Sequence, residues 1–148
     1  MRKATGADIA FHNRAGIRAP LQKGMVRLRD IYQVCPFRNT LVTMQLRGHE
    51  IRSLVQRAMS HPKYLLEVSG MELTVGKRGV EIRVAGTPLH LDQEYSVVTN
   101  SFLASGGDGH ILFTKGRKRK DTLLDILEVH KKAFQESSPI RLSFQQRI

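Results

Sequence analysis

The sequence predicts an α+β domain in which a mixed β-sheet carries helices on its outer faces. Short β-rich runs bounded by glycines or prolines recur along the chain and indicate about six to eight strands. Segments with apolar residues at helical spacing lie between these runs and indicate about three to four helices. The 148 residues are enough for a hydrophobic core, so we expect residues 1–148 to form a single domain.

The charge of the chain favours anionic partners. The sequence has 24 Lys and Arg residues against 13 Asp and Glu residues, which gives a formal net charge of +11. A single cysteine, Cys35, excludes an internal disulfide and a cysteine-rich metal site. No apolar run is long enough to span a membrane, and no apolar segment follows Met1. We therefore expect neither a membrane span nor a signal peptide in this chain.

The N-terminal residues predict the end of a helix followed by a strand. Residues 1–5 have the pattern of a last helical turn, with Gly6 as the residue that closes it. A domain that opens in this way is expected to be truncated, with Met1 as an internal residue of a longer polypeptide. Residues 8–12 are a short apolar run that predicts a buried strand.

A polar loop, residues 13–18, follows this strand. Asn13 can donate and accept hydrogen bonds toward a heterocycle, and Arg18 offers a fork for a phosphate or a carboxylate. A turn with an exposed arginine explains the same residues equally well. The loop is a candidate site, because polar loops that follow strands often carry function.

The middle of the chain alternates between helix and strand. Residues 26–34 have helical spacing, and Pro36 disfavours helical geometry for the residue before it. Phe37 then lies in a loop, either as a plug of the core or as an exposed stacking surface, and the plug is the commoner outcome. Residues 40–46 alternate as a strand, and Gly48 begins an amphipathic helix. Further β-rich runs occupy residues 64–67, 72–75 and 80–84, with a hairpin turn over residues 76–79.

The last third begins with a predicted strand over residues 95–99. Residues 115–120 carry the densest run of positive charge and no aromatic side chain, which favours a solvated loop over a nucleic-acid-binding arm. Asp121 suits the N-cap of a helix that runs to Gln135. Residues 139–144 predict a final strand.

Between residues 100 and 110, three glycines surround a single carboxylate, Asp108. Glycine is favoured where the backbone needs a positive φ or lies close to a ligand. One interpretation is a tight turn with an aspartate turn residue. The other is a site where Asp108 accepts two hydrogen bonds from a sugar diol or a guanidinium. From this stretch alone the turn is the commoner outcome.

Recognisable catalytic patterns are missing from the sequence. The 6 histidines are not spaced as metal ligands, and the adjacent His49 and Glu50 diverge at the start of a helix. There is neither a serine-nucleophile motif nor a phosphate-binding loop of the Walker type. The sequence therefore indicates binding groups without catalytic machinery, and we expect no cofactor in this chain.

Three segments in order, residues 7–18, 35–39 and 100–109, resemble the C-terminal domain of the 5′-nucleotidase family. This family includes UDP-sugar hydrolases, 2′,3′-cyclic phosphodiesterases and ecto-5′-nucleotidases. The resemblance extends over nearly the whole chain, and the ordered set is far more specific than any one segment. It implies a four-layer α/β/β/α arrangement with two sheets back to back between helical layers.

The resemblance also implies a role for each segment. Phe37 and Phe102 are similar to the two aromatic residues that sandwich the base in the family. Asn13 and Asn39 resemble the polar residues beside the base. Arg18 resembles the arginine that reaches the ribose-phosphate, and Asp108 resembles the carboxylate that holds the ribose hydroxyls. The residues implied to bind substrate are Asn13, Gly16, Arg18, Phe37, Asn39, Phe102, Gly107 and Asp108.

The sequence departs from the family pattern at three positions. Arg14 and Ala15 stand where the family is richer in glycine, and Ala15 resists a positive φ, so we expect this loop to differ slightly. Arg38 stands where a small residue is common and is expected to reshape the base pocket.

The resemblance further implies that catalysis belongs to an N-terminal metallophosphoesterase domain with two divalent metal ions. The chain by itself is then a substrate-binding domain for a nucleotide or nucleoside and is inactive alone. Its parent protein would be periplasmic or extracellular. A thiosulfohydrolase relative shares the two-domain plan, but its substrate has no base to stack between Phe37 and Phe102. The alternative from another class is a basic module that binds nucleic acid or another anionic partner through residues 115–120.

Overall fold

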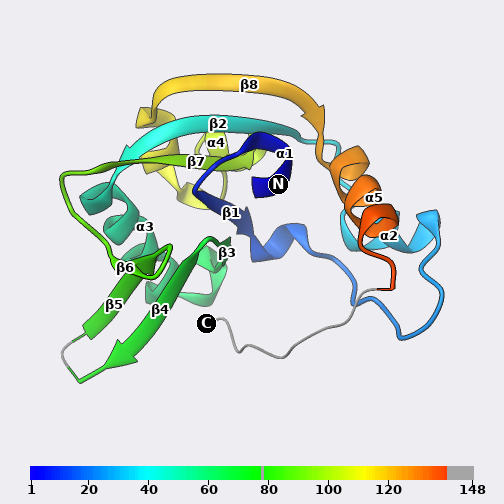
Figure 1. The fold of residues 1–148 in the computed structure, drawn as a ribbon, viewed down its shortest axis with the longest axis horizontal. Coiled ribbons are helices and arrows are strands. Elements are labelled where there is room, and N and C mark those ends of the chain that lie inside the picture. Colours follow the sequence, from blue (N-terminus) through cyan, green and yellow to red (C-terminus); the bar gives the residue numbers. More distant parts are fainter. Residues whose placement is uncertain (78, 140–148) are drawn as a thin grey trace.

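The computed structural model describes residues 1–77 and 79–139, and a five-stranded mixed sheet forms its centre. The strand order is β3-β1-β7-β2-β8 (Figure 1). β1 and β7 are parallel, and the other neighbours are antiparallel. The strands are β1 (Ile9–Asn13), β2 (Thr40–Arg47), β3 (Leu66–Ser69), β7 (Glu94–Asn100) and β8 (Arg117–Asp125).

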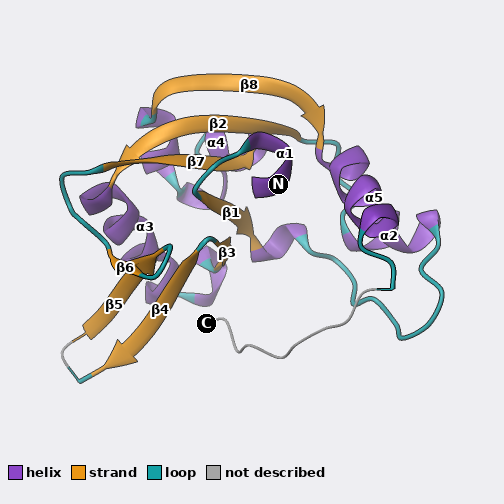
Figure 2. Cartoon of the chain, in the orientation of Figure 1, coloured by secondary structure: helices purple, strands orange, loops and turns teal. Residues whose placement is uncertain are grey.

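A smaller antiparallel sheet and several helices surround the large sheet (Figure 2). The small sheet has the order β4-β5-β6, and its strands are β4 (Met71–Gly76), β5 (Gly79–Val84) and β6 (Thr87–Pro88). The α-helices are α1 (Arg2–Thr5), α2 (Leu28–Val34), α3 (Gly48–Ser60), α4 (Ser101–Ala104) and α5 (Ile126–Glu136). Short 3₁₀ turns lie at Arg14–Gly16, Pro62–Tyr64, Gly107–Gly109 and Ile111–Lys115. Within the described residues, no helix has the length and apolarity needed to cross a membrane.

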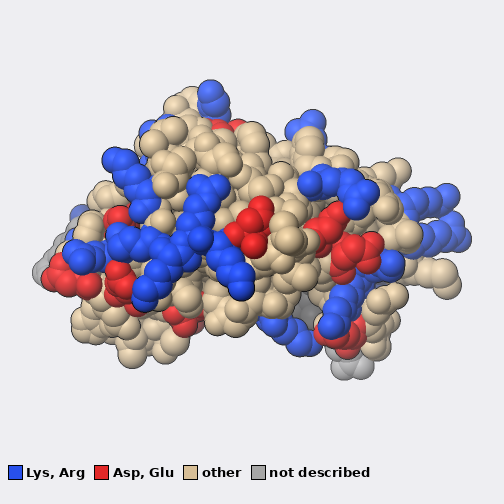
Figure 3. Space-filling view, turned by 90° about the horizontal axis from the view of Figure 1, so that it is seen from above, with Lys and Arg blue, Asp and Glu red and all other residues tan. Residues whose placement is uncertain are grey.

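β8 is the outer strand of the large sheet and overturns two predictions. The basic run expected as a solvated loop pairs instead with β2. The helix expected from Asp121 begins only at Ile126, where Asp125 is the N-cap. Leu123 falls within the range predicted for that helix, but it lies in β8, where the residue is 81% exposed and its φ is 60°. Figure 3 looks onto this edge and shows basic side chains gathered there with acidic ones between them.

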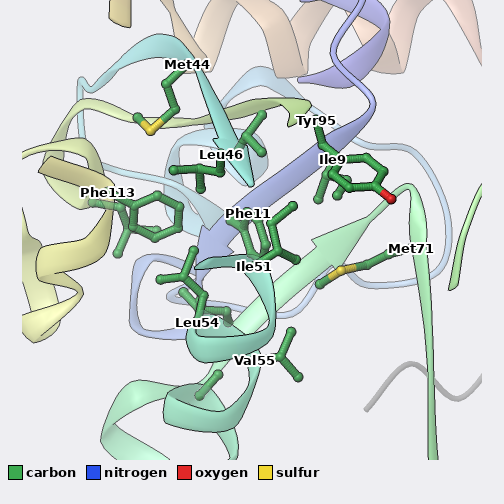
Figure 4. Packing of buried hydrophobic residues seen from close by; sticks show 14 of the residues in the cluster. Ile9, Phe11, Met44, Leu46, Ile51, Leu54, Val55, Met71, Tyr95 and Phe113 are labelled. Carbon is green, nitrogen blue, oxygen red and sulfur yellow. The ribbon is translucent and has the colours of Figure 1, made fainter. Parts of the chain in front are cut away.

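Both faces of the large sheet are covered by apolar side chains. On one face Ile9 and Phe11 pack with α3, whose Ile51 and Leu54 are fully buried (Figure 4). Ala10, which lies between Ile9 and Phe11 in β1, belongs to a second cluster on the other face, together with residues of β7 and α5. Alternate residues of a strand point to opposite faces, so a strand covered on both sides is apolar throughout.

The α+β class with helices packed around mixed strands is confirmed. The helix end at residues 1–5 is also confirmed, and Gly6 closes it with a φ of 72°. α2, β2 and α3 lie close to their predicted positions. The final strand predicted over residues 139–144 falls almost wholly outside the described residues.

Candidate functional site

A cavity of about 520 Å³ opens where three loops meet at one end of the large sheet. These loops are the turn after β1, the segment before β2 and the segment after β7. Seven of the eight residues singled out from the sequence line this cavity, and Gly107 lies just behind the lining. The lining residues are His12, Asn13, Ala15, Gly16, Arg18, Cys35, Pro36, Phe37, Arg38, Asn39, Phe102 and Asp108.

Two phenylalanine rings stand at this cavity with nearly half of their surface exposed. Phe37 is 48% exposed, and Phe102, in the first turn of α4, is 44% exposed. The commoner outcome for Phe37, a plug of the core, is therefore wrong. Large aromatic side chains gain much from burial, so two half-exposed rings on one cavity leave apolar faces available to a ligand.

Gly107 supports the ring of Phe102. A Cβ atom placed on Gly107 would lie 2.4 Å from Cε1 of Phe102, well inside van der Waals contact. Only glycine leaves the ring in this position, and this explains why Gly107 shapes the site without lining it.

Hydrogen bonds between side chains connect the end of β1 with the end of β7 and the loop that follows it. Asn13 Nδ2 donates to Asp108 Oδ2 at 3.0 Å, and Asn13 Oδ1 accepts from Asn100 Nδ2 at 3.0 Å. Asn100 is fully buried, and its Oδ1 accepts from the backbone N–H of Leu103 at 2.8 Å, which caps α4. Asn13 thus uses its side-chain oxygen and one N–H of its amide within the protein, and the bond from this N–H orients Asp108.

Asp108 has a backbone conformation that few non-glycine residues adopt. Its φ is 52° and its ψ is 20°. Gly106, two residues earlier, and Gly109, the next residue, also have positive φ values, of 87° and 76°. Aspartate tolerates this left-handed region better than most residues, and such strain concentrates at functional sites. Asp108 therefore sits in a tight turn, as the first interpretation of the stretch had it, and it also lines the cavity; its binding of a sugar diol or a guanidinium stays a prediction.

The segment before β2 is held at both of its polar side chains. Asn39 Oδ1 accepts from Ser101 Oγ at 3.1 Å. Arg38 donates from Nε and Nη2 to Asp125 Oδ2, at 3.0 and 2.8 Å. The hydrogen bonds that Arg38 donates to the Asp125 carboxylate raise the pKa of Arg38. Burial alone would raise the pKa of Asp125, but the Arg38 guanidinium and the N–H groups of α5 lower it.

The sequence matches the family described as "5′-nucleotidase, C-terminal domain" over residues 1–115. The chain belongs to this family. The trifunctional nucleotide phosphoesterase protein YfkN of Bacillus subtilis is 32% identical over 135 residues, 81% of this chain and 9% of that protein. Cell wall protein Lmo0130 of Listeria monocytogenes is 34% identical over 133 residues, 78% of this chain and 17% of that protein.

Solved structures of the family share the fold. The 5′-nucleotidase precursor of Thermus thermophilus superposes with a TM-score of 0.91 and 31% identity, covering 99% of this chain and 32% of that one. The sulfate thiohydrolase SoxB of the same genus has a TM-score of 0.71 and 18% identity, covering 97% of this chain and 29% of its own, and shows the fold alone. The chain thus spans about a third or less of each of these relatives.

The turn after β1 accommodates the residues that depart from the family pattern. Arg14 and Ala15 lie in the 3₁₀ turn Arg14–Gly16, where neither takes a positive φ. A Cβ atom on Gly16 would come within 2.6 Å of His12 Cε1, so glycine is needed where the turn closes on the strand. Arg18 donates its backbone N–H to Val34 O at 2.8 Å, and its side chain reaches Ala15 O at 3.3 Å.

Sequence reasoning missed His12 and Asn100. Burial lowers the pKa of His12, and its Nδ1 donates to the carbonyl of Asn13 at 2.8 Å. The carbonyl can only accept, so Nδ1 carries the proton of the neutral ring. The sequence could have indicated His12 and Asn100 only through their positions at or next to the ends of β1 and β7, because loops at strand ends often carry functional sites. Among the described residues, no three His, Cys, Asp or Glu side chains are grouped to hold a metal ion.

Proposed function

We propose that this cavity binds the nucleoside part of a nucleotide. The base lies between Phe37 and Phe102, the ribose hydroxyls bond to Asp108, and the phosphate lies toward Arg18. The observation that carries this proposal is the pair of half-exposed rings on a cavity that also holds an oriented carboxylate. Stacking contributes about 1–3 kcal/mol per base, and a volume of about 520 Å³ is typical of a small-molecule site.

In this proposal the chain presents the nucleotide to a metallophosphoesterase domain of the same parent polypeptide, which supplies two divalent metal ions and the hydrolytic step. The chain contributes positioning, which can lower a reaction barrier by fixing the reacting group in place. We further propose that the parent protein is periplasmic or extracellular, in keeping with a relative named as a cell wall protein.

Calorimetric titration with adenosine and AMP tests the proposed site. We expect Phe37→Ala and Phe102→Ala each to weaken binding roughly 5- to 150-fold, which corresponds to the loss of one stacked ring. Val75→Ala is the matched control, because Val75 is 53% exposed on β4 and does not line the cavity. Unchanged affinity in both phenylalanine variants would show that the nucleoside binds elsewhere.

The alternative of a basic nucleic-acid-binding module has less support. Arg117 pairs with Glu94 at 2.7 Å and Glu50 at 2.8 Å, and Arg119 donates to Ala104 O at 2.6 Å. Both arginines of the basic run therefore bind groups of the domain itself, which leaves fewer of its positive charges for nucleic acid. Salt separates the two functions, since nucleic-acid binding weakens steeply with salt while binding of uncharged adenosine does not.

A further inference from the structure

Arg38 lies between Phe37 and Asn39 and lines the same cavity, and an ion pair orients its guanidinium although its side chain is 76% exposed. Its Nε and Nη2 both donate to Asp125 Oδ2. The other oxygen of this carboxylate, Oδ1, accepts from the backbone N–H of Leu127 at 2.9 Å as the N-cap of α5. The partner of Arg38 is therefore anchored on a helix terminus rather than free to turn with it.

The backbone strengthens this attachment. The N–H of Ile126 donates to the carbonyl of Asn39 at 2.9 Å, which ties the segment before β2 to the start of α5. Figure 1 shows the end of β8 and the start of α5 beside the beginning of β2. Arg38 and Asn39, the two residues after Phe37, are thus held by contacts within the protein.

The unused polar groups at this end of the cavity are hydrogen-bond donors. A guanidinium has five N–H donors in a planar fork, and Asp125 takes two of those of Arg38, which leaves its Nη1 and Nη2 edge. Asn39 accepts from Ser101 through Oδ1, so its Nδ2 is left to donate. The edge of a base that approaches Phe37 therefore meets donors.

Purine bases differ in what they offer to such a fork. Guanine and hypoxanthine present two adjacent acceptors, O6 and N7, which an arginine can bind with two hydrogen bonds. Adenine presents N7 beside an amino group, which is a donor and opposes the second hydrogen bond. Stacking on phenylalanine tolerates every base, so selection between purines has to come from edge contacts of this kind.

We propose that Arg38 is a specificity-determining residue that makes this domain prefer 6-oxopurine nucleosides, such as inosine and guanosine, over adenosine. The inference rests on the proposed nucleoside-binding function of the same cavity. Because Asp125 balances the charge of Arg38, the guanidinium acts through its fork geometry rather than as a free cation for phosphate.

The test compares inosine and adenosine, which carry no phosphate, in calorimetric titrations of the full chain. We expect the wild type to bind inosine about 5- to 150-fold more tightly, which is the range for one bidentate contact. Arg38→Met should remove the preference, because the methionine side chain offers no hydrogen-bond donor to O6 and N7. Arg83→Met is the matched control, since Arg83 pairs with Glu81 at 2.9 Å on the small sheet, away from the cavity.

A change on the ligand gives a second measurement that does not depend on the folding of a variant. 7-Deazainosine lacks the N7 acceptor and should lose most of the preference of inosine on the wild-type protein. Equal affinity for inosine and adenosine in the wild type overturns this inference but leaves the proposed function intact. Retention of the preference in Arg38→Met overturns it as well. Failure of both nucleosides to bind overturns the inference together with the proposed function.

Discussion

At the scale of single residues, the cavity is organised by hydrogen bonds that the protein makes with itself. Asn100, fully buried, links the cap of α4 to Asn13, and Asn13 in turn orients Asp108. The ring of Phe102 and the carboxylate of Asp108 are therefore placed relative to one another by one chain of contacts. Such preorganisation lowers the entropy that the side chains of the site lose when a ligand binds.

Gly107→Ala tests the support of the Phe102 ring. The added Cβ would lie 2.4 Å from the ring, and because Phe102 is 44% exposed the ring can swing away. We expect affinity for adenosine to fall roughly 5- to 150-fold, as for the loss of one stacked ring. The free energy of unfolding should change by less than about 1 kcal/mol, the scale of a glycine-to-alanine change at a compatible backbone.

Gly76→Ala is the control for this variant, since its nearest neighbour would be the carbonyl oxygen of Gly79 at 4.0 Å. Calorimetry measures the affinity, and urea denaturation measures the unfolding. If Gly107→Ala binds adenosine as tightly as Gly76→Ala does, the ring does not depend on Gly107.

At the scale of elements, β8 shows where sequence patterns fail. Its bulges against β2 fall between Thr40 and Val42 and between Thr43 and Gln45, and the positive-φ residues Lys118 and Leu123 lie opposite them. Whether a charged run pairs as an outer strand depends on a partner far along the chain. Local spacing could not supply that partner, and it assigned exposed leucines to a helix that begins only at Ile126.

The site was more predictable than this strand. Its lining residues sit in three short motifs, each contiguous in sequence, so a pattern of residue types could find them. The hydrogen-bonding role of Asn13 could not be found in this way, because its partners Asn100 and Asp108 are 87 and 95 positions away. The orientation of Arg38 likewise depends on Asp125, at a helix start that the sequence placed four residues too early.

The junction of β8 with α3 predicts a pH dependence of stability. Burial alone would raise the pKa of Glu50, but hydrogen bonds from Arg117 and the backbone of Arg47 lower it below its ordinary 4.5. A carboxyl with a lowered folded pKa stabilises the protein above its unfolded pKa, and this contribution is lost as the pH falls through the folded value. Glu50→Gln should therefore lower the free energy of unfolding at pH 7 by about 1–3 kcal/mol, the scale of charged hydrogen bonds.

Urea denaturation at a series of pH values measures this effect. The difference between wild type and Glu50→Gln should shrink as the pH falls from about 5 to about 3, as the carboxyl is protonated. Glu81→Gln serves as the control, because Glu81 pairs with Arg83 at an exposed position. A difference between wild type and Glu50→Gln that stays constant across these pH values would contradict the role given to this ion pair.

At the scale of the whole molecule, the basic character of the chain and its binding site are separate features. The formal net charge is +11, yet several arginines are paired within the domain, and the proposed site is built from two rings, a carboxylate and an arginine fork that Asp125 already balances. The chain also corresponds to about a third or less of its relatives. This share is in keeping with our proposal that the chain holds the substrate while a neighbouring domain of a larger hydrolase reacts with it.

This division of labour predicts that the chain alone binds AMP without hydrolysing it. The isolated chain, incubated with AMP and Mn²⁺ or Zn²⁺, should release no phosphate above the level of the Phe102→Ala variant, because our proposal assigns the reacting metal ions to a separate metallophosphoesterase domain. In the parent polypeptide, Phe102→Ala should raise KM for AMP by about the factor by which it weakens binding, since the ring contacts the base and not the phosphate. Metal-dependent phosphate release by the isolated chain that disappears in Phe102→Ala would place catalysis within this domain and overturn the division of labour.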